Sequence, residues 1–237
     1  MRTYQTTPGG VSDVGIIRPT NEDSWSADGD IFIVADGMGG PDKGHTASSL
    51  AVTEVQAGFR DEPTADGIVA ALQRANGLIA NQGIEGMGTT IAVAAIVDTE
   101  AGDRPQFVIA NIGDSRVYLF RDGQLRLLSH DHSKVADLVR SGELTSEQAA
   151  IHPERHVLTQ AIGVGAEIDP FITQLIPARG DRLLLCSDGL FNEVPDAEIT
   201  QVLAHTEPSN EAAAELVGLA NHHGGSDNTT VVVVNIN

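Results

Sequence analysis

The stretch IFIVADGMGG, residues 31–40, places a carboxylate directly after a short apolar run and before a glycine-rich turn. The apolar residues from Ile31 to Ala35 suffice for a buried β-strand but are too few for a core helix, and the glycines that follow end regular structure. The pattern therefore predicts that Asp36 is held at the end of a strand. Because Asp-Gly is also a common hairpin turn, this stretch alone fits a plain turn as well as a functional carboxylate.

Three further aspartates flank strand-like segments elsewhere in the chain. Asp114 follows FVIANIG, Asp188 follows LLLCS, and Asp227 opens DNTTVVVVNI. In an antiparallel sheet the end of one strand lies beside the start of the next, so these carboxylates can share one edge with Asp36. Carboxylates gathered in this way repel one another unless a cation joins them, and oxygen ligands suit Mg²⁺ or Mn²⁺. The sequence therefore predicts a divalent metal centre.

Length and composition indicate one β-rich domain over residues 1–237. No linker rich in Pro, Gly or Ser and no block of charge divides the chain. Hydrophobic residues make up 41% of the sequence and aromatic residues only 4%, which predicts a core built from Val, Ile, Leu and Ala. The one cysteine, Cys186, excludes an internal disulfide, and its apolar neighbours predict a buried structural thiol rather than a nucleophile.

Charge and apolar patterning disfavour several classes of partner. The formal net charge of −19 argues against nucleic acid and against an anionic membrane, since both need a basic protein surface. No apolar run reaches the roughly 18 residues of a membrane span, and the first ten residues contain no apolar signal-peptide core. We expect a cytoplasmic protein with no membrane partner.

The apolar pattern predicts strands and helices that do not alternate regularly. Strands are expected at 11–17, 91–97, 107–112, 117–121 and 183–187, with a last one after Asp227. Amphipathic helices are expected within 46–59, 68–79, 196–203 and 209–222. Asp122-Gly123 predicts a type I′ hairpin turn. Because strands cluster and helices come in pairs, the expected fold class is α+β, a β-sandwich with helices packed outside it.

A polar, helix-forming insertion occupies about 133–165. Ser133 can cap a short helix, and Thr145 with Gln148 fits a capping box on a second one. Because the insertion has little core of its own, we expect a surface flap beside the acidic edge. The histidines in or near it lack the spacing of a zinc site and are expected to be solvated. These histidines are His130, His132, His152 and His156.

Arg18 begins the loop sequence RPTNED, which also contains Glu22 and Asp23. Pro19 favours an extended conformation at Arg18, which suits a loop that presents a long cationic side chain. Two roles are open for this arginine. It forms an ion pair with a neighbouring carboxylate, or its guanidinium binds an oxyanion such as phosphate.

Six motifs, in this order, resemble those of the metal-dependent (type 2C, PPM-class) protein Ser/Thr phosphatases of bacterial, single-domain type. They are RPTNED (18–23), VADGMGG (34–40), GTT (88–90), NIGDSR (111–116), CSDGL (186–190) and SDNT (226–229). Each motif is weak alone, but the ordered series is highly specific and covers 11–234. The resemblance implies two antiparallel β-sheets flanked by pairs of α-helices, in four layers, with two metals at one end.

The resemblance also implies metal ligands at matching positions. Asp36 would bridge two Mg²⁺ or Mn²⁺ ions, and the carbonyl of Gly37 would bind one of them. Asp188 and Asp227 would bind the other ion. Asp114, together with Asp188, would provide a weaker third metal position.

Three residues of the first motif have implied roles in the same site. Glu22 and Asp23 would act mainly through metal-bound waters. Arg18 would hold the phosphate oxygens and stabilise charge in the transition state. The implied reaction is hydrolysis of phosphoserine and phosphothreonine in proteins by a water activated between two metals, without a phosphoenzyme.

The implied partners are phosphorylated proteins and a bacterial Ser/Thr kinase whose signalling the enzyme reverses, and we expect a monomer. A cysteine-based phosphatase is disfavoured, because the sixth residue after Cys186 is Asn192 rather than the arginine of its phosphate loop. A metal-loaded pseudo-phosphatase, which binds phosphoproteins as a regulator without turnover, is the remaining alternative. Retention of the full set of acids favours the enzyme.

The chain departs from the family pattern at two places that touch no expected metal ligand. Pro41 stands where bacterial members usually carry His, and Gln160 stands where they commonly carry Arg. These departures leave the proton donor and the substrate specificity open. The nearest imidazole in sequence is His45, which is either the donor or a solvated surface histidine.

Overall fold

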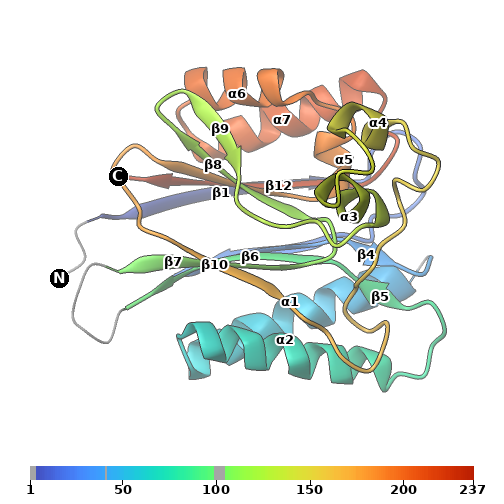
Figure 1. Cartoon of the computed structure of the whole chain (residues 1–237). Helices are drawn as coiled ribbons and strands as arrows, with labels where there is room; N and C mark the ends of the chain where they lie inside the picture. The colour runs from blue at the N-terminus through green and yellow to red at the C-terminus, as the bar shows by residue number, and fades with distance from the viewer. Residues whose placement is uncertain (1–3, 41, 99–104) are drawn as a thin grey trace.

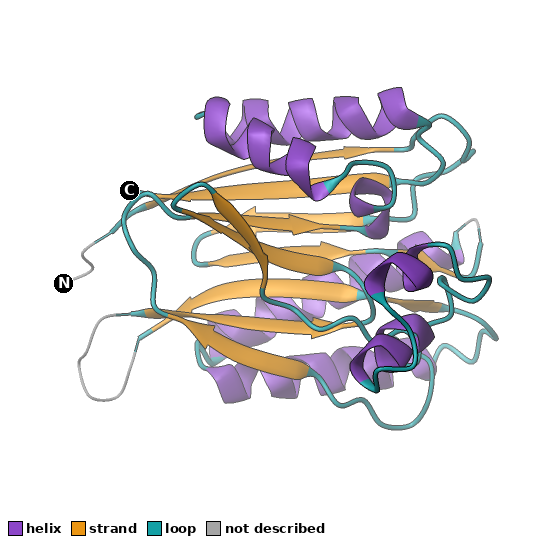
Figure 2. Ribbon diagram, turned by 45° about the horizontal axis from the view of Figure 1, so that its top comes forward, coloured by secondary structure: helices purple, strands orange, loops and turns teal. Residues whose placement is uncertain are grey.

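Two five-stranded antiparallel sheets pack face to face, and helices cover the outer face of each (Figures 1 and 2). This arrangement is seen in a computed structural model, which describes residues 4–40, 42–98 and 105–237. It confirms the expected α+β sandwich of four layers. No helix within those ranges combines the length and the hydropathy needed to cross a lipid bilayer.

The first sheet joins strands from both ends of the chain, in the order β1-β12-β11-β8-β9. These strands are β1 (Thr6–Asp13), β8 (Arg116–Arg121), β9 (Gln124–Leu127), β11 (Arg182–Cys186) and β12 (Thr229–Ile236). The last strand, β12, lies between β1 and β11 and is antiparallel to both. In Figure 1 the blue β1 therefore lies beside the red β12.

The second sheet has the order β10-β7-β6-β3-β2. Its strands are β2 (Ser24–Asp28), β3 (Ile31–Ala35), β6 (Ile91–Val97), β7 (Gln106–Ile112) and β10 (Phe171–Leu175). Every residue of β3 and β6 is buried, because the other sheet covers one face and helices cover the other. A two-residue ladder of β4 (Gly37–Met38) with β5 (Gly88–Thr89) continues beyond the end of β3.

Helices form the outer layers and the flap. Those that cover the second sheet are α1 (Lys43–Asp61) and α2 (Ala65–Ala80), and those that cover the first are α6 (Asp196–His205) and α7 (Ser209–His223). A single turn, α5 (Asp188–Phe191), directly follows β11. The segment expected to form a flap contains α3 (Lys134–Arg140) and α4 (Ser146–Ala150), which stand out from one end of the sandwich.

Three apolar layers make up the core: one between the sheets and one beneath each helix pair. Phe32 and Phe107 lie in the central layer among Val, Leu, Ile and Ala side chains. The aliphatic core predicted from the composition is therefore present. Each fully buried Val, Leu or Ile side chain contributes about 1.5–3 kcal/mol to the free energy of folding, so these three layers stabilise the sandwich.

Strand register gathers the acidic residues at one end. Val34 of β3 pairs with Ala92, and Ile91 pairs with Ile112 of β7, so Asp36 and the β7–β8 turn emerge together. In the other sheet Cys186 pairs with Val231, which brings the end of β11 beside the start of β12. Antiparallel pairing thus produces the shared edge predicted from the sequence, at the right of Figure 1.

Several boundaries differ from those expected. The first strand was predicted at 11–17 and instead ends at Asp13, whose Oδ1 accepts a hydrogen bond from the Gly15 amide. Gly15 has a φ of 80°, and the amides of Ile16 and Ile17 then bind the Gly225 carbonyl, so the chain has left the sheet. The short strands β2, β4, β5 and β10 were not predicted, because they are polar, very short or flanked by prolines.

The local predictions for turns and caps are confirmed. Asp122 and Gly123, with φ of 53° and 75°, connect β8 and β9 in the left-handed region that a type I′ turn requires. The Ser133 side chain accepts from the Ala136 amide at the start of α3. On α4, Thr145 and Gln148 form the reciprocal capping box.

Candidate metal centre

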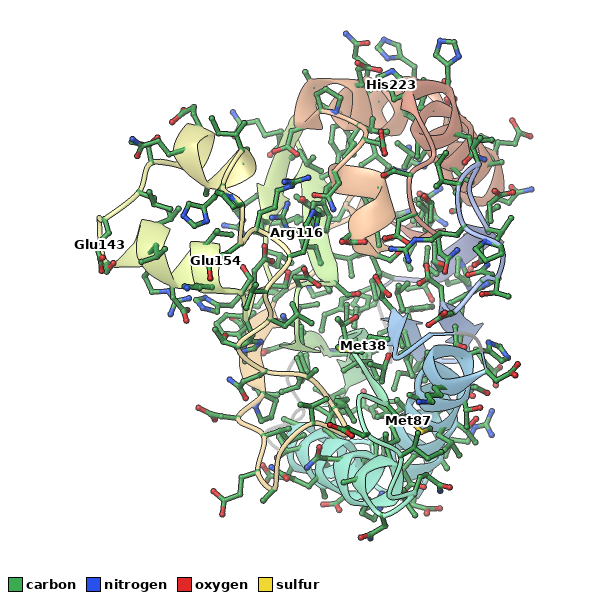
Figure 3. All side chains as sticks on the ribbon, turned by 90° about the vertical axis from the view of Figure 1, so that its right-hand side faces the viewer. Met38, Met87, Arg116, Glu143, Glu154 and His223 are labelled. Atoms are coloured by element: carbon green, nitrogen blue, oxygen red, sulfur yellow. The ribbon has the colours of Figure 1, made fainter. Side chains whose placement is uncertain are left out.

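An open cavity of about 700 Å³ lies at the end of the sandwich where the acidic residues meet. Strand ends supply its aspartates: Asp36 follows β3, Asp114 lies in the β7–β8 turn, Asp188 begins α5, and Asp227 precedes β12. Figure 3 looks onto this end of the molecule, with Met38 of β4 near its centre. Residues of the sequence-predicted site that line the cavity are Arg18, Glu22, Asp36, Gly37, Asp114, Asp188 and Asp227.

Burial and mutual repulsion make the charged forms of these acids costly. Desolvation, followed by the charges of Asp23 and Asp188, raises the pKa of Asp36 well above its ordinary value. Desolvation and the Asp188 charge raise the pKa of Asp114 to about 8. The pKa of Asp188 is likewise raised by burial and then by Asp227. A site that strains its own carboxylates in this way is stabilised by a bound cation.

Asp23 is fully enclosed and does not line the cavity. Burial raises its pKa to about 7, although hydrogen bonds from Thr230 and Ser187 act in the opposite direction. The Ser187 hydroxyl donates to Oδ2 of Asp23 over 2.8 Å, whereas Oδ1 has no hydrogen-bond partner. Oδ1 of Asp188 is also buried without a partner. Two orphaned carboxylate oxygens at one strand edge are an observation that a cation or its waters would explain.

The donor chemistry fits Mg²⁺ or Mn²⁺. Across the part of the chain that is described, no three His, Cys, Asp or Glu side chains form a ready-made metal cage. Mg²⁺ commonly keeps several waters and binds through only one or two carboxylates, so scattered acids with room for water suit it. The cavity has that room, and its carboxylates and the Gly37 carbonyl offer oxygen donors.

Glycines allow the first motif to approach the start of α1. A Cβ on Gly37 would lie 2.1 Å from the Gly44 carbonyl oxygen, and a Cβ on Gly44 would lie 1.9 Å from Oε2 of Glu22. Both contacts are impossible for any other residue without movement. The two glycines therefore let the Glu22 carboxylate lie against the first turn of α1, beside the carbonyl of Gly37.

Arg18 reaches across the cavity mouth to a metal-binding candidate. Its Nη2 donates to Oδ2 of Asp227 over 2.7 Å, and its side chain is 54% exposed. This hydrogen bond raises the pKa of Arg18, with a smaller opposing effect of burial. Of the two roles left open by the sequence, the ion pair is present, and the exposed guanidinium faces the same cavity as the acids.

Polar residues of the other motifs position this set, a role that the sequence pattern did not assign. The Asp36 amide donates to Oγ1 of Thr90, and Oγ1 of Thr89 donates to the Asp36 carbonyl. The Thr90 and Ser115 hydroxyls are 2.7 Å apart. The two threonines of the GTT motif, directly before the apolar run at 91–97, are the signal that could have indicated this role.

Asn228 fixes the RPTNED loop in the same way. Its Oδ1 accepts from the Glu22 amide, while its Nδ2 donates to the carbonyls of Val14 and Thr20. The last motif thus holds the first motif in place across the sheet edge. Because Asn228 is adjacent to Asp227, the backbone that presents one acid also positions Glu22.

Of the four histidines expected to be solvated, His132 is instead buried, so that expectation is wrong for it. Its Nδ1 accepts a hydrogen bond from the Gly113 amide. His45 is exposed near the start of α1 and is not among the cavity-lining residues. His156 of the flap does line the cavity. Pro41, on which the argument for His45 depends, lies outside the described residues.

Two other side chains are placed clearly. Cys186 is fully buried, and desolvation raises the pKa of its thiol far above the ordinary value, which confirms a structural thiol. Gln160 lines the cavity, and its Oε1 accepts from the Asp169 amide. The side-chain amide of Gln160, held by this hydrogen bond, thus occupies the position where an arginine is common in the family that the sequence resembles.

Comparison with known proteins agrees with this geometry. The sequence profile described as "Protein phosphatase 2C" matches residues 19–221. "Protein phosphatase PhpP" of Streptococcus pneumoniae is 37% identical over 242 residues, covering 96% of this chain and 96% of the relative. "Serine/threonine protein phosphatase PstP" of Mycobacterium tuberculosis is 39% identical over 233 residues, or 95% of this chain. This chain spans 44% of that mycobacterial protein.

Solved structures show the same likeness. The crystal structure of the Mycobacterium tuberculosis phosphatase PstP/Ppp has a TM-score of 0.88 and 37% identity, covering 97% of this chain and 98% of that one. A structure of the catalytic domain of PstP in complex with 2 manganese ions has a TM-score of 0.86 and 36% identity, covering 99% of both chains. From the profile match, the relatives and the shared architecture, we conclude that this chain belongs to the protein phosphatase 2C family of Ser/Thr protein phosphatases.

Proposed function

We propose that this protein hydrolyses phosphoserine and phosphothreonine in proteins, using water at a centre of two Mg²⁺ or Mn²⁺ ions. The observation that carries the proposal is the meeting of Asp36, Asp188, Asp227 and Arg18 around one open cavity. A phosphomonoester dianion repels hydroxide, so both the nucleophile and the substrate need positive charge nearby. The PstP catalytic domain described with 2 manganese ions supports a binuclear centre by analogy.

In this proposal the acids hold the ions in three groups. Asp36 would hold both ions, and the Gly37 carbonyl would add a ligand to one. Asp188 and Asp227 would hold the other, and Asp114 with Asp188 would provide a weaker third position. The ions would supply the positive charge that acidifies a water and neutralises the phosphate.

Glu22 and Asp23 act through water in the same scheme. The Glu22 carboxylate lies against Gly44 at the cavity edge, and the unpartnered Oδ1 of Asp23 points to a role in fixing a water rather than an ion. Both are held by backbone contacts: the Glu22 amide by Asn228 and the Asp23 amide by Oδ1 of Asn21. Their part is to orient water, since an enclosed Asp23 has no open path to substrate.

Arg18 binds the substrate phosphate. Its ion pair with Asp227 holds the guanidinium at the cavity mouth before substrate arrives. The guanidinium of Arg18, exposed at that mouth, would hold two phosphate oxygens and stabilise the charge that develops on them.

The proton donor to the departing alkoxide is one of two histidines. His45 was the candidate from its place in the sequence. It is exposed near the start of α1 and does not line the cavity, so it could donate a proton only to a peptide that extends over α1. His156 lines the same cavity as Asp188 and Asp227, so its imidazole lies on the wall of the proposed centre. We place the donor at His156.

The proposed partners follow from this chemistry. Substrates are phosphorylated proteins, including a cognate bacterial Ser/Thr kinase and its targets, in the cytoplasm. The net charge of −19 disfavours nucleic acid and also self-association, so the proposed state is a monomer. A metal-loaded pseudo-phosphatase is disfavoured because a binding module does not need the full acid set.

One assay tests the proposal. Purified protein with Mn²⁺ should release inorganic phosphate from a phosphothreonine peptide, and Asp36→Asn should not. Binding of the peptide without phosphate release would support the pseudo-phosphatase instead. Absence of both binding and release would reject the proposal.

A further inference from the structure

A second cavity of about 1260 Å³ opens directly from the catalytic cavity. The two share Arg18, Asp114, His156, Asp188 and Asp227 in their walls. It runs between the flap helices α3 and α4 on one side and α5 with the end of β9 on the other. In Figure 3 the flap stands apart from the body on this side, with Arg116 at its base and Glu143 at its tip. We call this cavity the flap groove.

Apolar side chains line both walls of the flap groove. Val135 and Val139 of α3 and Ile151 after α4 form the flap side, while Leu127 and Phe191 form the opposite side. Ile151 is 82% exposed and Leu127 is 41% exposed. Large apolar side chains so open to solvent on facing walls, beside a reaction centre, are typical of a surface that a ligand covers.

Charged side chains of both signs line the flap groove: four arginines, and the carboxylates of Asp114, Asp131, Asp188, Glu193 and Asp227. Arg116 is committed to its neighbours: its Nη2 lies 2.7 Å from Oδ2 of Asp131, and its guanidinium lies 3.7 Å above the Phe191 ring. Arg140 is paired with Asp137 in the same helix. Both arginines therefore already have a carboxylate partner. The contacts of Arg116 with Asp131 and Phe191 also connect the base of the flap to α5.

Arg155 differs from these arginines. It is exposed at the groove wall, and the described carboxylates include none that forms an ion pair with it, whereas nearby Lys134 is paired with Glu154. An unpaired guanidinium can pair with a carboxylate or phosphate of a ligand, while the apolar surface beside it contacts an apolar side chain of the same ligand.

We propose that the flap groove binds the substrate polypeptide next to its phosphoresidue and selects segments that carry both an apolar and an acidic residue. The apolar side chain packs against Ile151 and Val139, and the acidic group pairs with Arg155. This inference rests on the proposed phosphatase function. It names a substrate class for that site: phosphoproteins with acidic and apolar residues close to the phosphorylated Ser or Thr.

Continuity and charge favour a substrate segment over other occupants. A polypeptide whose phosphate reached Arg18 would have its flanking residues in the flap groove, because the two cavities share their walls at that point. A second copy of the chain would bring a net charge of −19 as a whole protein, whereas a short substrate segment brings only a few charges, one of which pairs with the guanidinium of Arg155.

The test compares matched phosphothreonine peptides in the wild type and in charge-reversed Arg155→Glu. The peptides differ only in whether Glu or Lys stands at each flanking position, and the readout is kcat/KM relative to that of p-nitrophenyl phosphate, which is too small to fill the groove. At one flanking position or more, wild type should have a higher kcat/KM for the Glu peptide than for the matching Lys peptide. Arg155→Glu should lower this ratio by about 10-fold, because an exposed attraction becomes a repulsion. Arg126→Glu, at an exposed arginine outside the groove walls, is the matched control.

The apolar wall has its own pair of variants. Ile151→Asp should reduce kcat/KM for peptides with a flanking Leu by roughly 5-fold more than for peptides with Ser at that position, because burying the Leu side chain against a carboxylate forfeits its transfer free energy. Ile176→Asp, at an isoleucine 62% exposed elsewhere, should change neither ratio. Thermal unfolding of each variant checks that the fold is retained.

Three outcomes would overturn the inference: no change of preference in either groove variant, equal loss on every substrate, or dimer formation by wild type that Ile151→Asp abolishes in light scattering. Binding of a fluorescent peptide with a phosphonate in place of the phosphate, measured by fluorescence anisotropy, distinguishes failure of the groove proposal from failure of the proposed phosphatase function. If turnover is absent but Arg155→Glu still weakens binding of the acidic phosphonate peptide, the groove stands and the proposed catalysis falls. If turnover is normal and that binding is unchanged, the groove falls alone.

Discussion

Arg18 and Asp227, 209 residues apart in the sequence, meet through a 2.7 Å hydrogen bond from Nη2 to Oδ2. The loop after β1 supplies the cation and the loop before β12 supplies the anion, and these strands are paired neighbours in one sheet. The sheet register therefore sets the distance between the group proposed to hold phosphate and one proposed to hold metal. In the proposed mechanism, this pairing would couple the position of the phosphate-binding group to that of a metal ligand.

Replacing Arg18 by Ala should chiefly weaken phosphate engagement. Loss of a charged hydrogen-bond donor to an oxyanion should raise KM, or lower kcat/KM, by about 10- to 100-fold, while metal binding persists. Steady-state kinetics with a phosphopeptide, together with calorimetric titration of Mn²⁺, measure the two effects separately. Loss of metal binding in Arg18→Ala with unchanged KM would contradict the assigned role.

Removing the charge of Asp36 should abolish both turnover and tight metal binding. This carboxylate is proposed to serve both ions, and the amide of Asp36→Asn cannot supply the negative charge. Because burial raises the pKa of Asp36 well above its ordinary value, the neutral variant should fold at least as well as wild type without metal. Mn²⁺ titration and thermal unfolding check this, and a variant with wild-type rates would refute the metal assignment.

Replacing Asp114 by Ala should remove only the proposed third metal position. Asp114 lies in the β7–β8 turn, whereas Asp36 directly follows β3 and Asp227 precedes β12. We expect a crystal structure of Asp114→Ala grown with Mn²⁺ to retain the two core ions. Loss of either core ion would show that Asp114 supports the binuclear centre itself.

The metal-free protein should lose stability as the pH rises above neutrality. Burial holds the pKa of Asp23 at about 7 and that of Asp114 at about 8. An acid with a higher pKa folded than unfolded contributes stability that is complete below the unfolded value and is lost as pH rises through the folded one. His130 and His132, whose pKa values are lowered by burial, act in the opposite sense near their ordinary value of 6.5.

Thermal unfolding in EDTA between about pH 7 and pH 9 chiefly reports the carboxylates, because both histidines are mostly neutral there in the folded and unfolded states. Tm should fall across that interval, and the fall should be smaller in Asp114→Asn. Added Mn²⁺ should flatten the curve, since bound cations favour the ionised acids. A flat curve in EDTA would show that the acids are not strained.

The two histidine candidates can be told apart with two substrates. The alkoxide leaving from phosphothreonine needs a proton, whereas nitrophenolate leaves readily without one. His156→Ala should reduce phosphopeptide turnover by about 10²-fold, the lower end for general acid catalysis, with a much smaller effect on p-nitrophenyl phosphate. His45→Ala should have little effect on either, and the reverse pattern would return the role to His45.

Strand-end acids could be predicted from the sequence because chain direction and antiparallel pairing leave few places for them. Asp36, Asp114, Asp188 and Asp227 each sit beside a clear apolar run, and the register then brings them together. The polar β2 and the short β4 and β5 have no such pattern, since their pairing is decided by neighbouring strands. Local propensity does not contain that information.

Side-chain environments were predictable only where residues close in the sequence decide them. The capping box at Thr145 depends on three neighbours and was found. Burial of His132 depends on the Gly113 amide, 19 residues away, and the cavity position of His156 depends on how the flap folds back. Contacts of that range come from tertiary packing, which spacing along the chain does not encode.

The place of β12 has a consequence for how the protein is made. This strand follows Asp227, and it fills the position between β1 and β11 in its sheet. While a ribosome is still extending the chain through residue 226, the sheet has a gap between two unpaired edges, and one of the proposed metal ligands has not been synthesised. Pairing of such distant segments is slow relative to local folding, so the sandwich closes only late. Nascent chains should therefore have no phosphatase activity until β12 has emerged from the ribosome.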